Sequence, residues 1–362
     1  SDVKSRRSII AIGIFLWSIM TAVCGLAKSF FQLFLARVGV GVGEAALTPA
    51  AYSMISDYFS EEKLGRAMGA YKSGAMVGGG LAFIIGGAVV GYVVNSESII
   101  LPILGEMKPW QMAFILVGLP GILIGLLMLT VREPKRTGLE GSLGERVSIS
   151  DAIKYMRERW KLYLFIFLGF AFMATPISTA LTWIPVYLQR IHQMSIADSG
   201  KTLGVIIFFL STTGVLFSGW LIDFLKKKGF KDGYFRVALS ICVITLPVAY
   251  FVMNDQSLEN TLWWLHLFVF VASMPLAISA TVLQIVTPNQ LRAQVSAVYM
   301  LFLNLITALL ATTGIGFITD YWFGDEMALG QSITSVNLIS MVLAFSCLYV
   351  AKANFNKEFT KS

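Results

Sequence analysis

Apolar runs recur along the whole chain, and no other feature of the sequence limits its fold so strongly. Each run holds about 20 residues, which as a helix is long enough to cross a hydrocarbon core of roughly 30 Å. Charged residues make up only 14% of the 362 residues, whereas soluble domains average roughly a quarter. The sequence therefore predicts an all-α polytopic membrane protein. The ten expected spans cover residues 8–27, 31–58, 64–94, 110–131, 161–189, 198–225, 235–253, 261–286, 293–318 and 332–351.

Lysine and arginine residues are distributed unevenly between the segments that join these spans. If the chain starts in the cytoplasm and crosses the membrane at every span, about 22 basic residues fall on the cytoplasmic side, where such residues accumulate. The external segments hold only Lys28, Lys108, Arg190 and Lys201. We therefore expect both ends of the chain in the cytoplasm, and a bacterial inner membrane as its location.

The sequence offers little chemistry for catalysis. It contains two histidines and no HExxH, GxSxG or DxD pattern, which argues against an enzyme. Its three cysteines, Cys24, Cys242 and Cys347, lie in apolar segments without metal-ligand spacing, so we expect them to be small core residues. We predict no catalytic residue, no metal, no cofactor and no nucleic-acid partner. A membrane-embedded enzyme or a receptor remains as an alternative.

A short charged pattern occurs once in each half of the chain. In SDVKSRR an aspartate lies four and five residues before two arginines, and in GWLIDFLKKKG an aspartate lies four and five residues before two lysines. Two spans later KLGRAMG aligns with LRAQVSA, so that Gly65 corresponds to Ala293. Structural repeats of this kind are typical of membrane transporters. The repeated charged residues are Asp2, Arg6, Arg7, Asp223, Lys227 and Lys228.

The repeat also predicts how the chain is organised. Two spans precede Asp223, whereas only Ser1 precedes Asp2, so we expect two amino-terminal helices to be missing from this chain. The expected parts are an amino-terminal half with four helices at residues 1–131, a central cytoplasmic loop at 132–160 and a carboxyl-terminal six-helix half at 161–362. In the loop, SISDAIKYMRERW indicates a short amphipathic helix on the cytoplasmic face, with a disordered linker as the alternative.

These patterns resemble those of the major facilitator superfamily of secondary transporters. The repeated D-x-x-x-[RK]-[RK] segment is similar to its gating loop, and the third span carries a glycine pattern similar to that of its antiporters. The pattern departs from the antiporter form at Ala82 and Phe83, where glycine and proline are usual. Within the superfamily, FFQLFLARVGVGVGEAALTPAAYSMISDYF most resembles the Spinster family. The glycines of the pattern are Gly69, Gly78, Gly86 and Gly87.

The resemblance implies a secondary active transporter that works by alternating access and is coupled to protons. A Spinster-like protein is implied to move an amphipathic or lipid-like molecule of the lysolipid type. Transporters of sugar acids carry a similar arginine and glutamate, so a proton-coupled symporter of an organic anion, such as a sugar acid or a phosphate, is the alternative. The implied partners are the lipid bilayer, a small-molecule substrate and protons, and we expect a monomer. Asp2 with Arg6 and Asp223 with Lys227 are implied to be breakable clamps that hold the cytoplasmic side closed.

The segment RVGVGVGE places two opposite charges, Arg37 and Glu44, inside an apolar run. Residues seven apart lie on the same face of a helix, two turns apart. A charge at the bilayer centre costs about 2.5–3.5 kcal/mol, so such residues usually face an interior cavity. The glycines at 39, 41 and 43 predict close helix packing beside this face. The alternative is that the two charges neutralise each other or lock the fold through partners on another helix.

A third charge, Lys72, lies in the next span within GAYKSG. It could bind an acidic headgroup together with Tyr71 and Ser73, or it could extend its four-carbon stem to the cytoplasmic surface. The carboxyl-terminal half contributes hydroxyl and amide side chains that could line the same cavity or form ordinary hydrogen bonds between helices. These polar residues are Thr175, Thr179, Thr182, Gln284 and Asn304.

Overall fold

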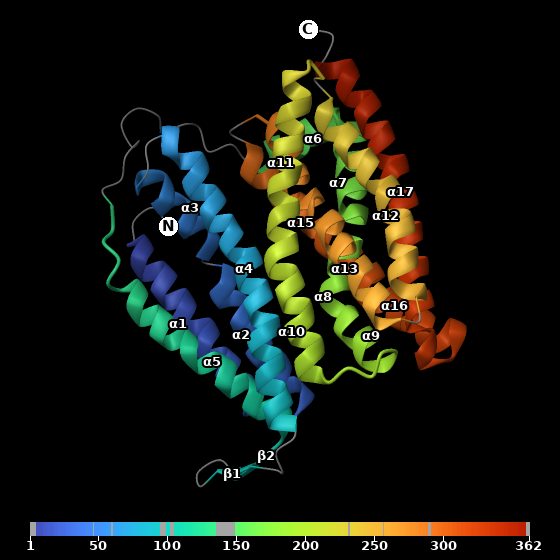
Figure 1. The fold of residues 1–362 in the computed structure, drawn as a ribbon. Helices are drawn as coiled ribbons and strands as arrows, with labels where there is room; N and C mark the ends of the chain where they lie inside the picture. The colour runs from blue at the N-terminus through green and yellow to red at the C-terminus, as the bar shows by residue number, and fades with distance from the viewer. Residues whose placement is uncertain are drawn as a thin grey trace. The chain divides into compact units, whose positions relative to one another are not determined.

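Helices dominate the computed structural model, as the sequence predicts (Figure 1). It describes residues 5–45, 47–58, 61–94, 99–101, 105–134, 149–230, 232–255, 257–288 and 291–359. Within these residues, two short antiparallel strands, β1 (Ile99–Leu101) and β2 (Gly105–Met107), pair Ile99 with Met107. The all-α expectation is therefore confirmed, with this hairpin as a small addition.

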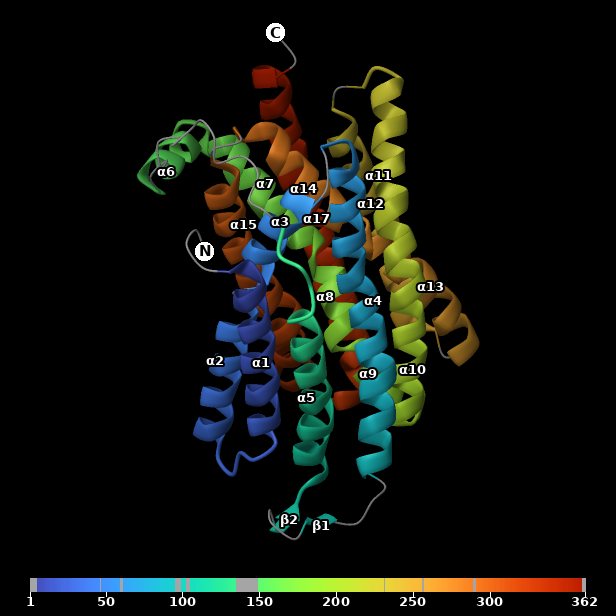
Figure 2. The same cartoon turned by 90° about the vertical axis from the view of Figure 1, so that its left-hand side faces the viewer.

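The first of two compact units comprises residues 1–142 together with 195–204. Its helices are α1 (Arg6–Cys24), α2 (Phe30–Ala45), α3 (Leu47–Tyr58), α4 (Glu61–Val94) and α5 (Pro109–Met128), with most of α10 (Ile196–Ile206). Helix α1 packs against α5 on one side and against α2 on the other, as Figure 2 shows. An apolar cluster at the start of α1 joins Ile10 and Ile14 to Met54 on α3.

The second unit comprises residues 143–194 and 205–362. Its core is apolar and aromatic and is built mainly where α7, α12, α15 and α17 pack together. The helical elements are α6 (Ile149–Glu158), α7 (Trp160–Met173), α8 (Thr175–Thr182), α9 (Ile184–Arg190), η1 (Ile207–Ser211), α11 (Thr212–Lys227), α12 (Gly233–Asn254), α13 (Leu258–Ser273), α14 (Pro275–Val286), α15 (Arg292–Thr307), η3 (Ala308–Gly314), α16 (Ile315–Phe317), η4 (Ile318–Phe323), η5 (Glu326–Ala328) and α17 (Leu329–Phe359). Helix α6 confirms the predicted helix in the central loop. The division into halves that the repeat predicts stays a prediction.

Eight helices in the described part of the chain are long and apolar enough to cross a membrane. The predicted spans 31–58 and 64–94 are helical too, as α2 with α3 and as α4, but they are not among the eight. Two predicted spans are broken where a proline lies at the first or second position of the next helix, at Pro176 and Pro185 in the span 161–189 and at Pro275 in the span 261–286. Proline has no backbone N–H and fits best at the first turn of a helix, which explains these breaks.

Candidate functional site

Helix α2 carries the two charges that the sequence places inside a span. It is helical from Phe30 to Ala45, so Arg37 and Glu44 lie on one face, separated by about 10 Å along the axis. Both side chains are exposed. Within the described residues they form no ion pair with each other or with any other group. The structure therefore presents an open arginine and an open carboxylate on one helix face.

The glycines between these charges divide into two groups. A Cβ at Gly43 would lie 2.8 Å from the backbone nitrogen of Trp17 on α1, and a Cβ at Gly39 would meet the side chain of Met20. Gly41 has nothing within 4 Å of such a Cβ. Close packing is therefore confirmed at Gly39 and Gly43. Gly41 lies on the charged face and leaves it uncovered.

Of the three residues singled out in the neighbouring span, the structure describes the side chain of one. Tyr71 is half-buried and packs against the apolar cluster of α1 and α3. The side chains of Lys72 and Ser73 lie outside the described part of the chain, so their roles stay predictions.

The glycine pattern on α4 is described in part. A Cβ at Gly87 would lie 3.0 Å from the Cα of Gly200 on α10, whereas one at Gly78 or Gly86 would meet nothing within 4 Å. Gly87 thus marks a close approach of two helices within the first unit. The surroundings of Gly69 lie outside the described residues.

The polar residues of the second unit do not form one lining. Thr175 and Thr179 are fully buried, and the Thr179 hydroxyl donates to the Asn337 side chain on α17 at 3.5 Å. Such a contact is the interhelical hydrogen bond that the sequence left open for these residues. Thr182 and Asn304 are exposed, and the side chain of Gln284 lies outside the described residues. Among the described side chains of this set, two threonines are therefore buried between helices, and Thr182 and Asn304 are exposed.

At the start of α1 the structure reveals a buried ion cluster that the sequence did not predict. Arg6 is only 2% exposed, and its guanidinium donates to the Asp57 carboxylate at the end of α3. Its backbone N–H donates to Oε1 of Glu133 at 2.8 Å, and its Nη2 donates to the carbonyl of Pro134 at 3.2 Å. The hydroxyl of Ser5 donates to the same glutamate. The cluster joins α1, α3 and the segment after α5.

Hydrogen bonds lower the pKa of Glu133 in this cluster. The hydrogen bond from Ser5, followed by those from Arg6, holds the pKa of Glu133 below its ordinary value although burial opposes the shift. Arg7 donates from Nη1 to the carbonyl of Leu129 at 3.3 Å. The predicted partner Asp2 lies outside the described residues, so the proposed Asp2–Arg6 clamp stays a prediction. The described carboxylate partners of Arg6 are those of Asp57 and Glu133.

The second copy of the charged pattern lies at the end of α11. Lys227 and Lys228 are exposed, and the Lys228 ammonium lies 4.6 Å from the centroid of the Phe224 ring. The side chain of Asp223 lies outside the described residues.

A different aspartate makes the ion pairs in this region. Asp232 accepts from Arg236 Nε at 2.7 Å and lies 3.2 Å from Lys352 Nζ on α17. Burial raises the pKa of Asp232, but these two cations outweigh it and hold that pKa below its ordinary value. The sequence pattern could have found Arg236, four residues away, but not Lys352.

Comparison with known proteins places the chain among transporters. The family described as Major Facilitator Superfamily matches residues 1–312. The chain is 26% identical over 368 residues to an MFS-type efflux pump of Mycolicibacterium smegmatis, covering 99% of this chain and 80% of the relative. It is 25% identical over 353 residues to the D-galactonate transporter of Escherichia coli O6:H1, covering 92% and 78% of the two chains.

The fold has solved counterparts. A crystal structure of a bacterial homologue of the human lysosomal transporter Spinster, inward-facing and unoccupied, matches with a TM-score of 0.76 and 24% identity. The match covers 98% of this chain and 85% of that one. The Spinster-like fold expected from the sequence is thereby confirmed.

Proposed function

We propose, from the premise that this chain belongs to the Major Facilitator Superfamily of transporters, that it carries a small organic anion across the membrane together with protons. The observation that carries the proposal is the open face of α2, where Arg37 and Glu44 are exposed without an ion-pair partner in the described residues. This substrate class differs from the lipid-like one that the Spinster resemblance implies. We prefer it because a relative matched over 92% of this chain is a D-galactonate transporter.

Arg37 has the chemistry that an organic anion requires. A guanidinium presents a planar set of donors that fits a carboxylate or a phosphate through two parallel hydrogen bonds. Where little water surrounds the guanidinium and the anion, as in a membrane cavity, the attraction between their charges is stronger than in bulk water. Gly41 leaves space next to this guanidinium, because nothing lies within 4 Å of a Cβ placed there. A small anion could therefore approach the side chain directly.

Glu44 is the proposed site of proton coupling. A carboxylate on the same face as a bound anion repels it, and protonation removes that repulsion. Binding of the anion would then favour protonation of Glu44. Release of the proton would favour release of the anion, and the reverse. Alternating access between the two halves would carry both across the membrane. We place this protein, as a monomer, in a bacterial inner membrane.

The buried cluster around Arg6 could serve as the breakable contact of such a cycle. It joins the start of α1 to the end of α3 and to Glu133 after α5. Arg6 and Asp57 are buried, so opening this contact would require the cluster to become accessible to water, which could then solvate the separated charges. We propose that this cluster, with Lys227 and Lys228 in the second unit, takes part in closing the cytoplasmic side.

An amphipathic, lipid-like substrate is the second candidate. It is favoured by the structural match to the bacterial Spinster homologue. The two candidates differ in a simple way, since a sugar acid has no apolar chain to bury. The two candidates are separated by measuring uptake of labelled galactonate into proteoliposomes in the presence of unlabelled galactonate or of a lysophospholipid as competitor.

The test uses the intact protein reconstituted in liposomes with an imposed pH gradient. Arg37→Lys keeps the charge but loses the fork of donors, so we expect weaker binding of the acid with the proton gradient still effective. Glu44→Gln should leave binding measurable and abolish the dependence of uptake on the pH gradient. Glu106→Gln, at an exposed position in the hairpin, is the matched control. Uptake that still follows the pH gradient in Glu44→Gln would show that the coupling assignment is wrong.

A further inference from the structure

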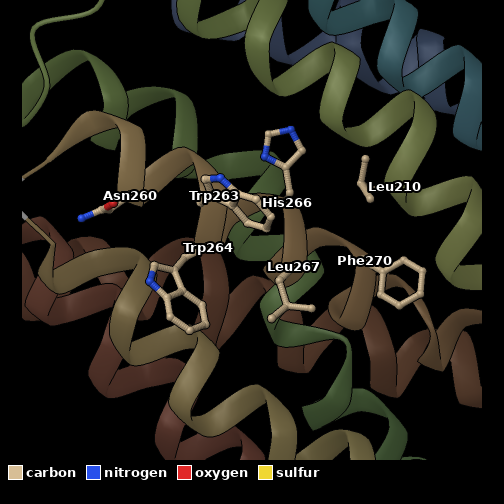
Figure 3. A pocket seen from close by; sticks show the side chains of 7 residues that line it. All are labelled: Leu210, Asn260, Trp263, Trp264, His266, Leu267 and Phe270. Carbon is tan, nitrogen blue, oxygen red and sulfur yellow. The ribbon is translucent and has the colours of Figure 1, made fainter.

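The second unit contains a cavity of about 590 Å³ on the surface of α13 (Figure 3). Its walls come from Leu210 in η1 and from one face of α13, where Trp263, Leu267 and Phe270 follow each other. The volume falls within the roughly 300–1,000 Å³ that small-molecule sites occupy. Both helical segments belong to spans that are apolar enough to cross a membrane. The medium around this groove is therefore the bilayer.

The groove has a closed inner end. A Cβ at Gly214 on α11 would collide with the carbonyl oxygen of Phe270 and with the Ser273 hydroxyl on α13. The two helices therefore touch backbone to backbone at this point, and only glycine permits that approach. Leu210 lies one helical turn before Gly214, where η1 forms the opposite wall. A π-helical turn such as η1 is frequent at functional sites.

Polarity changes along the groove. Phe270, Leu267 and Leu210 form its apolar inner part, and Asn260 lies at the other end of the α13 face. Ten residues of helix separate Asn260 from Phe270, which corresponds to about 15 Å along the axis. Trp263 between them is 76% exposed and lies near the start of the apolar span Leu258–Leu283; tryptophan rings are enriched at such membrane–water interfaces. The groove thus has the polarity of an amphiphile that lies along α13.

His266 also belongs to this face. Its Nδ1 lies 2.6 Å from the backbone carbonyl of Leu262. A carbonyl oxygen only accepts, so Nδ1 is the donor in this contact. Figure 3 shows the ring standing away from the α13 ribbon.

The charge of the site selects a headgroup. Within the described residues no lysine or arginine lines the cavity, and exposed Glu259 precedes Asn260 on α13, four residues before Trp263 and on the same face. An indole ring attracts a cation placed over it, and a carboxylate does the same. Among the described lining residues, the donors for a phosphate are the Asn260 amide and the indole N–H groups of Trp263 and Trp264. The site fits an ammonium better than a purely anionic headgroup.

We propose that the groove between η1 and α13 binds one phospholipid of the surrounding bilayer whose headgroup carries an ammonium group, as in phosphatidylethanolamine. One acyl chain lies between Leu210 and Leu267 towards Phe270, and the ammonium lies near Trp263 and Glu259. This proposal uses none of the residues of the α2 face and does not depend on which solute the protein carries.

The test is lipid retention by the intact purified protein, measured by native mass spectrometry during titration with phosphatidylethanolamine, phosphatidylcholine or phosphatidylglycerol. Leu210→Trp fills the groove. Leu216→Trp is the matched control, because Leu216 is an exposed apolar residue of α11 outside the cavity. We expect Leu210→Trp to weaken retention of one phosphatidylethanolamine on the order of tenfold and Leu216→Trp to leave it unchanged. Leu267→Trp replaces Leu210→Trp if the latter does not fold.

The headgroup is tested with Glu259→Gln. This variant should lower the preference for phosphatidylethanolamine over phosphatidylglycerol. Equal retention of the ethanolamine and choline lipids supports recognition of the ammonium. Equal retention of phosphatidylglycerol by the native protein, or unchanged retention in the groove-filling variant, overturns the proposal.

Discussion

Asp57→Asn should destabilise the first unit strongly, because it removes a charge from the cluster around Arg6. The Arg6 side chain is 2% exposed and that of Asp57 10%, so water cannot replace the lost carboxylate. Removal of one partner from a buried ion pair costs roughly 3–5 kcal/mol. Glu133 remains 3.6 Å from Arg6 Nε and is 26% exposed, so we expect the lower end, about 3 kcal/mol.

The size of the effect can be measured as a shift in Tm. For a cooperative unit of 150–250 residues, each kcal/mol corresponds to roughly 2–4 °C, so Asp57→Asn should lower Tm by about 6–12 °C. Glu358→Gln is the control, because it removes a surface carboxylate from Arg159 at 3.4 Å with both side chains about a third exposed. Such pairs contribute at most about 1 kcal/mol. The assay is tryptophan fluorescence during heating of the purified protein in detergent at pH 7.5.

A double variant tests whether an unpaired buried charge causes the loss of stability, and not only how large the shift in Tm is. Arg6→Met combined with Asp57→Leu removes the two most buried charges of the cluster and leaves Glu133, which is 26% exposed, in partial contact with water. Apolar replacement of a buried pair is often neutral or stabilising. We expect it to recover most of the Tm lost in Asp57→Asn. If Asp57→Asn lowers Tm no more than Glu358→Gln, or if the double variant is less stable than the single one, the buried cluster does not have the energetics that its geometry implies.

Three further perturbations follow from the described contacts, and each is measured by thermal unfolding. Gly43→Ala should lower the free energy of unfolding by about 1–3 kcal/mol, because the added methyl group overpacks against α1. Gly41→Ala has open space around it and should raise that free energy by up to about 1 kcal/mol through better helix propensity. Equal shifts in Tm for the two variants would contradict this. Asp232→Asn should cost about 2 kcal/mol near neutral pH by weakening the charged hydrogen bonds to α12 and Lys352. Because the pKa of Asp232 is lowered, the native protein should lose its extra stability over Asp232→Asn as the pH falls below the ordinary aspartate pKa of about 3.9. Parallel curves of Tm against pH for the two proteins would refute this. Burial lowers the pKa of His192, although Asp255 opposes it, so stability should fall as the pH drops below the ordinary histidine value of about 6.5, and His192→Phe should flatten that fall.

Local periodicity predicts the helices and the position of the charged α2 face, because both follow from short-range spacing. Arg37 and Glu44 lie on one face in the structure as the seven-residue spacing requires. Burial of Cys24 and Cys242 also follows from their apolar surroundings. In contrast, the length of a span does not predict where it breaks, as at Pro176 in the span expected at 161–189.

Partners that depend on the tertiary fold are harder to predict. Arg6 lies 51 residues from Asp57 and 127 from Glu133, and no local pattern links such positions. The repeated charged pattern drew attention to Asp2, four residues before Arg6. The one sequence signal for Asp57 and Glu133 as partners of Arg6 is that each carboxylate lies at the end of a predicted span, where basic residues also gather. Only the packing of α1, α3 and α5 selects among them.

The contrast between paired and open charges supports the assignment of the α2 face. Arg6 and Asp232 are buried at helix ends, and each is matched by opposite charge. Arg37 and Glu44 lie within a predicted span and have no such match among the described residues. A charge at the bilayer centre costs about 2.5–3.5 kcal/mol for each residue if it faces lipid. Our proposal therefore expects the exposed α2 face to contact water, protons and a charged solute.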